Sequence, residues 1–306
     1  MPAKFKKIVM WVLLAFVSAF LLGCYDVFKK KSLNGNAVIP VLFFNTLISS
    51  VIFIPFVLLS YFTNVLDGTV LYVPKVSFAT HSLVMLKSVI VLSSWITGYF
   101  AVKNLPLTIV GPIKATQPML TLTGAIIIFG ERLNLYQWIG VLLSILSFYL
   151  LSLSGKKEGI NFSHNKWIFY AVLSIVFGAI SGLYDNYLMK SLDVMTVQVW
   201  FNVYQVLIMI PILMLLWYPR RNQTTRFTWK WSIIFVSIFL AMADWVYFYA
   251  LSDPDAMISI ISMIRRSSVL VTFTAGALFF SEKNLKNKAF DLFLVLLGMI
   301  FLYLGT

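Results

Sequence analysis

The stretch IRRSSVLVTFTAGALFFSEK, residues 264–283, decides the fold because it aligns without gaps on IKATQPMLTLTGAIIIFGER, residues 113–132. GLYDNYLMKSL at 182–192 likewise matches GCYDVFKKKSL at 23–33 at six of eleven positions. Two shorter matches lie between these pairs: WFN at 200–202 with FFN at 43–45, and ADWVYFYA at 243–250 with SSWITGYFA at 93–101. The chain therefore consists of two similar halves.

The composition places both halves in a membrane. Of the 306 residues, 60% are hydrophobic and 11% are charged, whereas a soluble domain carries about 25% charged residues. A spanning helix needs about 20 apolar residues. Ten such segments follow one another: 8–28, 38–62, 80–102, 107–129, 135–154, 166–189, 195–217, 231–251, 256–280 and 287–305. Because the connections are short, we expect one all-α membrane domain over residues 1–306, with no soluble domain.

Each half holds five of these segments, over residues 8–154 and 166–305. Because five is odd, the second half enters the membrane from the opposite side, so the repeats are inverted about an axis in the membrane plane. Inverted repeats are typical of carriers that work by alternating access, with the substrate site near the midplane.

The N-terminus allows two interpretations. A basic start, an apolar run and LLGC ending at Cys24 resemble a lipoprotein signal. The repeat favours an uncleaved first helix, because its second copy lies deep inside the chain and Cys24 aligns with Leu183. As the only cysteine, Cys24 also excludes a disulfide within the chain.

Two basic residues lie deep in these segments at equivalent places of the repeat, Lys114 and Arg265. A charge at the centre of a spanning helix costs roughly 2.5–3.5 kcal/mol. At 1.5 Å per residue both lie about 12–15 Å deep and approach the midplane from opposite sides. Facing cations repel unless an anion lies between them, and arginine holds phosphate or carboxylate bidentately. The pattern predicts an anion site, to which Arg266, pointing about 100° away from Arg265, would add a further cation.

Internal charge pairing is the competing explanation. Three acids also lie within apolar segments, against four bases: Asp26, Asp185 and Asp244 against Lys87, Lys114, Arg265 and Arg266. Polar residues pair inside membrane bundles, so these groups could form a structural network. Asp26 and Asp185, in the repeated GxYD motif, could instead gate the site or couple it to protons, or pair with Lys31 and Lys190 at the helix ends. Asp244 could titrate or hold an arginine.

Other polar and aromatic residues carry weaker predictions. Trp95 and Trp245 align between the repeats and could line the cavity or pack in the core. Lys87 lies six residues into its segment, where it could reach the substrate or extend to the interface. Structural turn roles are expected for two acids that end the fourth and ninth segments, Glu131 and Glu282. His81 and His164 lie far apart, and no nucleotide, metal or redox motif occurs. We therefore predict no enzyme activity, cofactor or metal.

The chain resembles a known family over nearly its whole length. FGERL…QWIGVLL at 129–143, with its more divergent counterpart FSEKNLKNKAFDLFLVLL at 280–297, resembles the drug/metabolite transporter superfamily in its EamA form. The resemblance implies a ten-helix carrier built from two five-helix repeats. It covers many substrates and selects none of them.

Two segments resemble another family more finely. IKATQPMLT and MIRRSSVLV are similar to the segments of plastid triose-phosphate translocators whose basic side chains grip the substrate phosphate. The resemblance implies anion contacts for Lys114, Arg265 and Arg266. The chain departs from that pattern at Gln117, where those carriers often have an acid, and at Arg265, where they have lysine.

Orientation follows from the loop charges. The side that holds both termini collects six Lys and Arg residues and the other side fourteen, which places both termini outside by the positive-inside rule. The basic N-terminal tail argues for the opposite orientation, and a C-terminal fluorescent reporter would decide between them. We expect the bacterial inner membrane as the location.

The leading prediction is a secondary carrier for a small anionic metabolite, which could bear phosphate. The alternatives are an exporter of amino acids or other zwitterions, and a lipid-phosphate flippase. The expected partners are the substrate, the lipid bilayer and a coupling proton or counter-substrate, but no nucleic acid.

Overall fold

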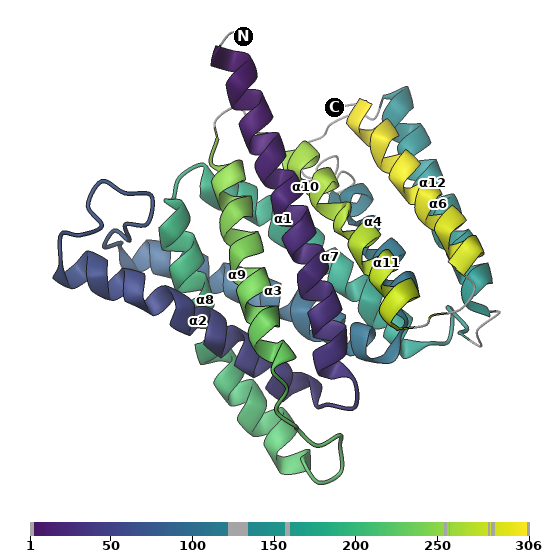
Figure 1. Cartoon of the computed structure of the whole chain (residues 1–306), viewed down its shortest axis with the longest axis horizontal. Coiled ribbons are helices and arrows are strands. Elements are labelled where there is room, and N and C mark those ends of the chain that lie inside the picture. The colour runs from purple at the N-terminus through teal and green to yellow at the C-terminus, as the bar shows by residue number, and fades with distance from the viewer. Residues whose placement is uncertain are drawn as a thin grey trace.

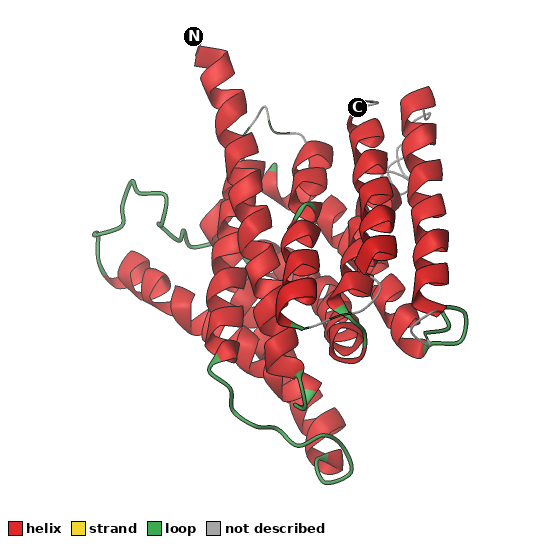
Figure 2. Cartoon of the chain, turned by 45° about the vertical axis from the view of Figure 1, so that its right-hand side comes forward, coloured by secondary structure: helices red, strands yellow, loops and turns green. Residues whose placement is uncertain are grey.

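The computed structural model describes residues 3–121, 134–156, 160–253, 256, 258–280, 282 and 285–304. All regular secondary structure in these residues is helical (Figure 2), which confirms the all-α prediction for them. Six helices are long and apolar enough to cross a membrane: α1 (Ala3–Leu33), α2 (Val38–Phe62), α3 (Phe78–Asn104), α7 (Lys166–Met189), α8 (Val194–Ile212, extended by a π-helical turn, Leu213–Trp217) and α9 (Ser232–Leu251).

Five further α-helices of the described chain fall on the other predicted segments, of which α6 runs two residues past the predicted end and α12 begins two residues before the predicted start: α4 (Leu107–Ala115), α6 (Leu135–Lys156), α10 (Ile258–Arg266), α11 (Ser268–Phe279) and α12 (Leu285–Leu304). Polar side chains that accept a backbone N–H begin three of the spanning helices, namely Ser77 before α3, Asn165 before α7 and Asp193 before α8. Such caps satisfy donors that the first helical turn leaves unpaired. The count of ten spanning helices and the inversion of the repeats stay predictions.

The ninth predicted segment is not one continuous helix, because it breaks at Ser267 between α10 and α11. The Ser267 hydroxyl donates to the carbonyl of Ile264, three residues earlier, at 2.6 Å. α4 ends in the same way at Thr116, whose hydroxyl donates to the carbonyl of Ile113 at 2.7 Å. Such bonds compete with the helical ladder and bend it. Thr116 and Ser267 are equivalent in the repeat, so the helix of each basic segment is interrupted two residues after Lys114 or Arg265.

Helix packing follows the repeat. Because α1, α3 and α4 correspond to α7, α9 and α10, the main contacts of one half recur in the other. α1 packs on α9 as α7 packs on α3, and α1 contacts α10 as α7 contacts α4. Corresponding helices also pack on each other, as α6 and α12 do at the right of Figure 1. This exchange of partners is the pattern that a two-fold relation between the halves produces.

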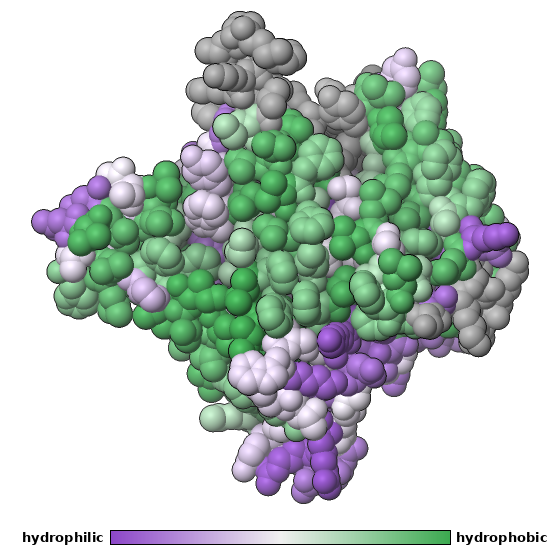
Figure 3. All heavy atoms as spheres, in the orientation of Figure 1, coloured by the Kyte–Doolittle hydropathy of each residue, from purple (hydrophilic) through white to green (hydrophobic). Residues whose placement is uncertain are grey.

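The outer surface carries a broad apolar zone. Figure 3 shows hydrophobic side chains over the middle of the molecule and hydrophilic ones gathered at its lower end. Large apolar side chains of α1, including Leu13, Phe16 and Phe20, are exposed on this surface. Exposed apolar area of this extent is suited to lipid rather than to water.

The first helix is longer than predicted. The sequence placed residues 29–31 in a loop, but α1 continues to Leu33 and buries Lys29 inside the bundle. Lys288 of α12, counted with the loop charges although it lies at the start of the tenth segment, is fully buried and donates to the hydroxyl of Thr108 at 2.8 Å. Both assignments were wrong because a lysine with a polar partner can lie inside a membrane bundle. Removing these two from the fourteen loop charges leaves twelve against six, so the predicted orientation keeps its sign.

Candidate functional site

A cavity of about 150 Å³ lies between the helices of the two halves. Residues of α1, α3, α4, α7, α8, α9 and α10 line it, with Gln117 and Thr121 just beyond α4, which places it among helices of both halves. Most of the predicted site residues line this one cavity: Lys87, Trp95, Lys114, Gln117, Asp185, Asp244, Arg265 and Arg266. Their side chains come from segments up to about 180 residues apart, so the fold brings them together.

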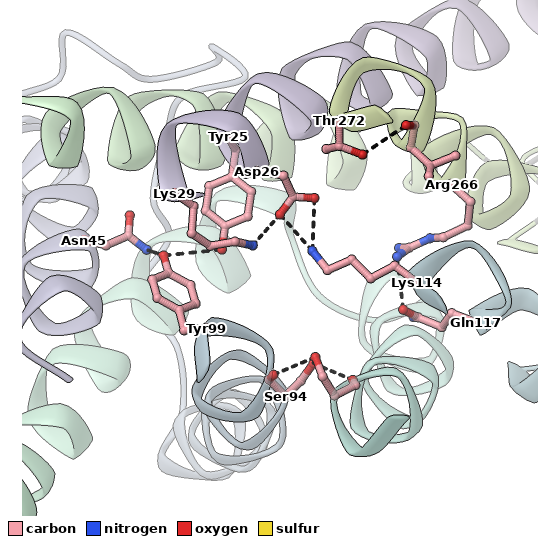
Figure 4. Close-up of polar contacts among 12 residues, drawn as sticks. Tyr25, Asp26, Lys29, Asn45, Ser94, Tyr99, Lys114, Gln117, Arg266 and Thr272 are labelled. Carbon is pink, nitrogen blue, oxygen red and sulfur yellow. Dashed lines mark hydrogen bonds and ion pairs between the residues drawn. The ribbon is translucent and has the colours of Figure 1, made fainter. Parts of the chain in front are cut away.

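Asp26 stands beside the cavity and contacts two lysines (Figure 4). The Lys114 Nζ donates to its two carboxylate oxygens at 2.8 and 3.0 Å, from α4 to α1. Lys29, one turn along α1, donates to the same carboxylate. Asp26 is buried, and an ionised carboxylate inside a bundle is stable when cations and donors surround it. Asp26 is therefore a counter-ion shared by two bases.

Asp185, the repeat equivalent of Asp26, is paired with Lys87 of α3. Lys87 is only 2% exposed, and its ammonium lies 4.5 Å from the ring centre of Phe201 and 4.8 Å from that of Phe248. The idea that Lys87 extends to the membrane interface is wrong. The carboxylate and the two aromatic faces together hold this ammonium inside the bundle.

Asp244 holds Arg265. The Nη2 of Arg265 donates to a carboxylate oxygen of Asp244 at 2.9 Å, and its guanidinium stacks 4.0 Å above the ring of Tyr247. One α9 turn separates Asp244 from Tyr247, so a single face of that helix binds both the edge and the plane of the guanidinium. Arg265 is thereby fixed in position at the cavity wall.

Arg266 differs from the other cations of the cavity. Its Nη1 donates to the amide oxygen of Gln117 at 3.0 Å, but no carboxylate of the described chain lies within 4.0 Å of it. Its Nε, like that of Arg265, has no hydrogen-bond partner among the described residues. Gly178 makes room for Gln117, since a Cβ there would lie only 2.8 Å from the amide oxygen. Because glutamine is neutral, this pairing does not compensate the charge of Arg266.

The charges in and beside the cavity do not cancel. Five described bases (Lys29, Lys87, Lys114, Arg265 and Arg266) meet three described acids (Asp26, Asp185 and Asp244), so five minus three leaves two positive charges. The sequence counted four of these bases and missed Lys29. The spacing of Asp26 and Lys29, one helical turn apart, is the signal that could have identified it.

Comparison with known proteins gives the family. The model of the EamA-like transporter family matches residues 9–153 and 165–304, which together make up most of the chain. The chain belongs to the EamA-like transporter family. It is accordingly an integral, multi-pass membrane protein of a family of transporters, and the resemblance to the drug/metabolite transporter superfamily is confirmed. The finer resemblance to the triose-phosphate translocators stays a prediction.

Two further comparisons were made with this EamA-like chain, one with curated proteins and one with solved structures. No curated protein matches it significantly. A solved structure named "Crystal structure of protein" superposes with a TM-score of 0.64 over 96% of both chains, at 13% sequence identity. At that identity the likeness shows a shared fold alone.

The two tryptophans of the EamA-like chain have different positions. Trp95 lines the cavity and packs edge-on against Phe201, with ring centres 5.9 Å apart. Trp245 is not among the lining residues and stacks instead on Tyr249 at 5.8 Å. The prediction that both could line the cavity was wrong for Trp245. Asp244 and Tyr247 lie on the face of α9 that lines the cavity. Adjacent helical residues point about 100° apart, so Trp245 points away from that face.

The remaining predicted residues lie away from the cavity. The His81 ring nitrogen contacts the Tyr204 hydroxyl at 3.0 Å, and exposed His164 contacts Ser163. Glu282 accepts the backbone N–H groups of Leu107 and Thr108 at 2.7 and 2.8 Å, which is a structural role at the start of α4. Glu131 lies outside the described residues. Cys24 lies within α1 of this EamA-like chain and is half-buried.

Proposed function

We propose that the protein is a secondary carrier that moves a small anionic metabolite, such as a phosphate ester, across the membrane by alternating access. The observation that carries this proposal is the excess of two positive charges among the described residues in and beside the central cavity, where no described carboxylate lies within 4.0 Å of Arg266. Uncompensated charge inside a bilayer is costly, so the excess implies a ligand or a hydrated site. An anion supplies the compensating charge.

The expected site consists of Lys114, Arg265 and Arg266. Arg266 offers an unpaired Nε, and the side chain of Lys114 is 24% exposed, the most open of the paired bases. Arginine and lysine together suit an oxyanion, because the planar fork binds two oxygens and the ammonium adds a point charge. Gln117 positions Arg266 through its amide oxygen.

Alternating access is supported by the symmetric packing. α4 and α10 carry the equivalent cations Lys114 and Arg265. α4 ends just before Thr116 and α10 just before Ser267, where the side-chain hydroxyl bonds to the backbone three residues earlier. A ten-helix chain of two inverted repeats would present these interruptions to opposite sides of the membrane. Exchange between two equivalent arrangements of the halves then opens the cavity to one side at a time.

The size and place of the cavity favour a metabolite over a lipid. Its volume of about 150 Å³ is below the roughly 300–1,000 Å³ of drug-sized ligand pockets. The lining residues come from helices of both halves. A lipid-phosphate flippase needs a groove that admits acyl chains, and a cavity of this volume is small for them. Small phosphates and carboxylates are therefore the preferred class.

Export of a zwitterion is the second candidate, favoured by the carboxylates of Asp185 and Asp244 in the same cavity wall. These acids could accept an ammonium while Arg266 holds a carboxylate. The two candidates differ in whether a substrate without a positive charge is accepted.

Counterflow in proteoliposomes tests the proposal. Vesicles preloaded with an unlabelled phosphate ester should accumulate the labelled ester, and an amino acid of similar size should not compete. Accumulation of amino acids but not of phosphates or carboxylates would replace the leading proposal by the second candidate. Vesicles carrying the Arg266→Gln protein serve as the control for leakage and adsorption.

A further inference from the structure

Among the described residues in and beside the cavity, one carboxylate is paired with two bases and two carboxylates with one base each. Asp26 accepts from Lys29 and Lys114, whereas Asp185 is paired with Lys87 and Asp244 with Arg265. In the repeat, Leu188 of α7 stands where α1 has Lys29. The first half of the chain therefore carries a base that its repeat partner lacks.

The two partners of Asp26 differ in how firmly they are held. The side chain of Lys29 is 3% exposed and that of Lys114 is 24% exposed. The ammonium of Lys29 also lies 4.2 Å from the ring centre of Tyr25 and 5.2 Å from that of Tyr99, which bind a cation through their faces. Lys114 lines the cavity and touches Asp26 across a helix–helix boundary. Lys29 is thus the more firmly held partner of Asp26, and Lys114 is the partner whose side chain has space in the cavity.

We propose that Lys29 is a positioning residue of the anion site: it keeps Asp26 neutralised, so that Lys114 can turn from Asp26 to the anion. This inference rests on the proposed function, since it concerns the anion site in the same cavity. Without a second base, the move of Lys114 would leave a buried carboxylate unpaired, which is strongly unfavourable. With Lys29 in place, the bond to Asp26 is exchanged for a bond to the anion.

The same reasoning separates the roles of Lys114 and Arg265. Arg265, in the repeat position of Lys114, is a partner of Asp244, for which the described chain offers no second base within 4.0 Å. Release of Arg265 would strand Asp244, so Arg265 stays at the wall and contributes through its remaining donors. The anion is gripped by Lys114, which leaves its acid, and by Arg266, which pairs with no acid of the described residues.

A thermodynamic cycle on the full-length protein in detergent tests the inference, with inorganic phosphate as the probe and calorimetric titration as the readout. The proteins are the wild type, Lys29→Gln, Asp26→Asn and the double variant Asp26→Asn/Lys29→Gln. In the wild-type background Lys29→Gln should weaken phosphate binding about tenfold or more, because Lys114 becomes the last partner of Asp26. In the Asp26→Asn background the same change should leave the affinity within about twofold, because no carboxylate holds Lys114.

Lys31→Gln is the matched control, since Lys31 lies two residues further along α1 and is exposed. An equal loss from Lys29→Gln in both backgrounds would mean that Lys29 acts through its charge alone, and would overturn the inference. Reduced thermal stability of Lys29→Gln with unchanged phosphate affinity would overturn it as well. Failure of the wild type to bind phosphate or any other small anion would instead remove the proposed function, and the inference with it.

Discussion

Arg265 and Arg266 are neighbours in the chain, yet their replacement by glutamine should have opposite consequences. Arg266 has no carboxylate partner in the described chain, so Arg266→Gln strands no acid and the new amide can still pair with Gln117. Arg265→Gln removes the base of Asp244, whose side chain is 13% exposed. Breaking a buried pair in this way costs about 3–5 kcal/mol of stability.

The effect on binding can be estimated from the bonds that Arg266 offers. A hydrogen bond to a charged group contributes about 1.5–3 kcal/mol, and about 1.4 kcal/mol corresponds to a tenfold change in affinity. Arg266→Gln should therefore weaken anion binding roughly ten- to a hundredfold while the midpoint of thermal unfolding stays near that of the wild type. Lys114→Gln should do the same, because Lys29 remains with Asp26.

Thermal unfolding and phosphate titration, both measured on Arg265→Gln, Arg266→Gln and Lys114→Gln, check this prediction. Arg265→Gln should unfold at a distinctly lower temperature, and the double variant Arg265→Gln/Asp244→Asn should recover much of the loss. If Arg266→Gln lost stability but kept its affinity for anions, Arg266 would belong to a structural network and the reasoning would fail.

Three further predictions concern the acids and their partners. Lys87→Met should lower stability by about 3–5 kcal/mol because it leaves Asp185 unpaired, and adding Asp185→Asn should restore most of it; an unaltered unfolding midpoint in Lys87→Met would contradict the assignment. Asp185→Asn in proteoliposomes should remove the pH dependence of uptake while binding persists, if this carboxylate couples transport to protons, and a retained pH dependence would make its role structural. Glu282→Ala removes the acceptor of two N–H groups at the start of α4. Denaturant or thermal unfolding should therefore show a stability lower by about 0.5–2 kcal/mol. An unchanged stability would mean that water replaces the carboxylate at no cost.

The sequence predicted the six described spanning helices and most of the residues that line the cavity, because apolar runs and charges within them are strong local signals. Segments 38–62 and 166–189 coincide with α2 and α7, since long apolar runs in a membrane can satisfy their backbone only as helices. Lys114 and Arg265, which the alignment places at equivalent positions of the repeat, both line the cavity, as a two-fold relation between the halves would arrange for residues near its axis.

What the sequence could not supply is which base belongs to which acid. The run of three lysines at 29–31 is typical of a loop, and only the packing of α1 shows that Lys29 is buried beside Asp26. The orientation of Trp245 depends on which face of α9 meets the cavity, and an apolar helix shows no clear periodicity. The breaks at Thr116 and Ser267 depend on a hydroxyl rotamer that composition does not reveal.

The central claim is that the cavity selects small anions. It is tested most directly by the thermal unfolding of the purified wild-type protein with metabolites matched in size but differing in charge: phosphate esters, carboxylates, amino acids and neutral polyols. The unfolding midpoint should rise with the concentration of phosphates or carboxylates, as expected for a ligand that binds the folded state, and the rise should vanish in Arg266→Gln. A midpoint that rises with amino acids or neutral polyols, and with no anion, would contradict the claim.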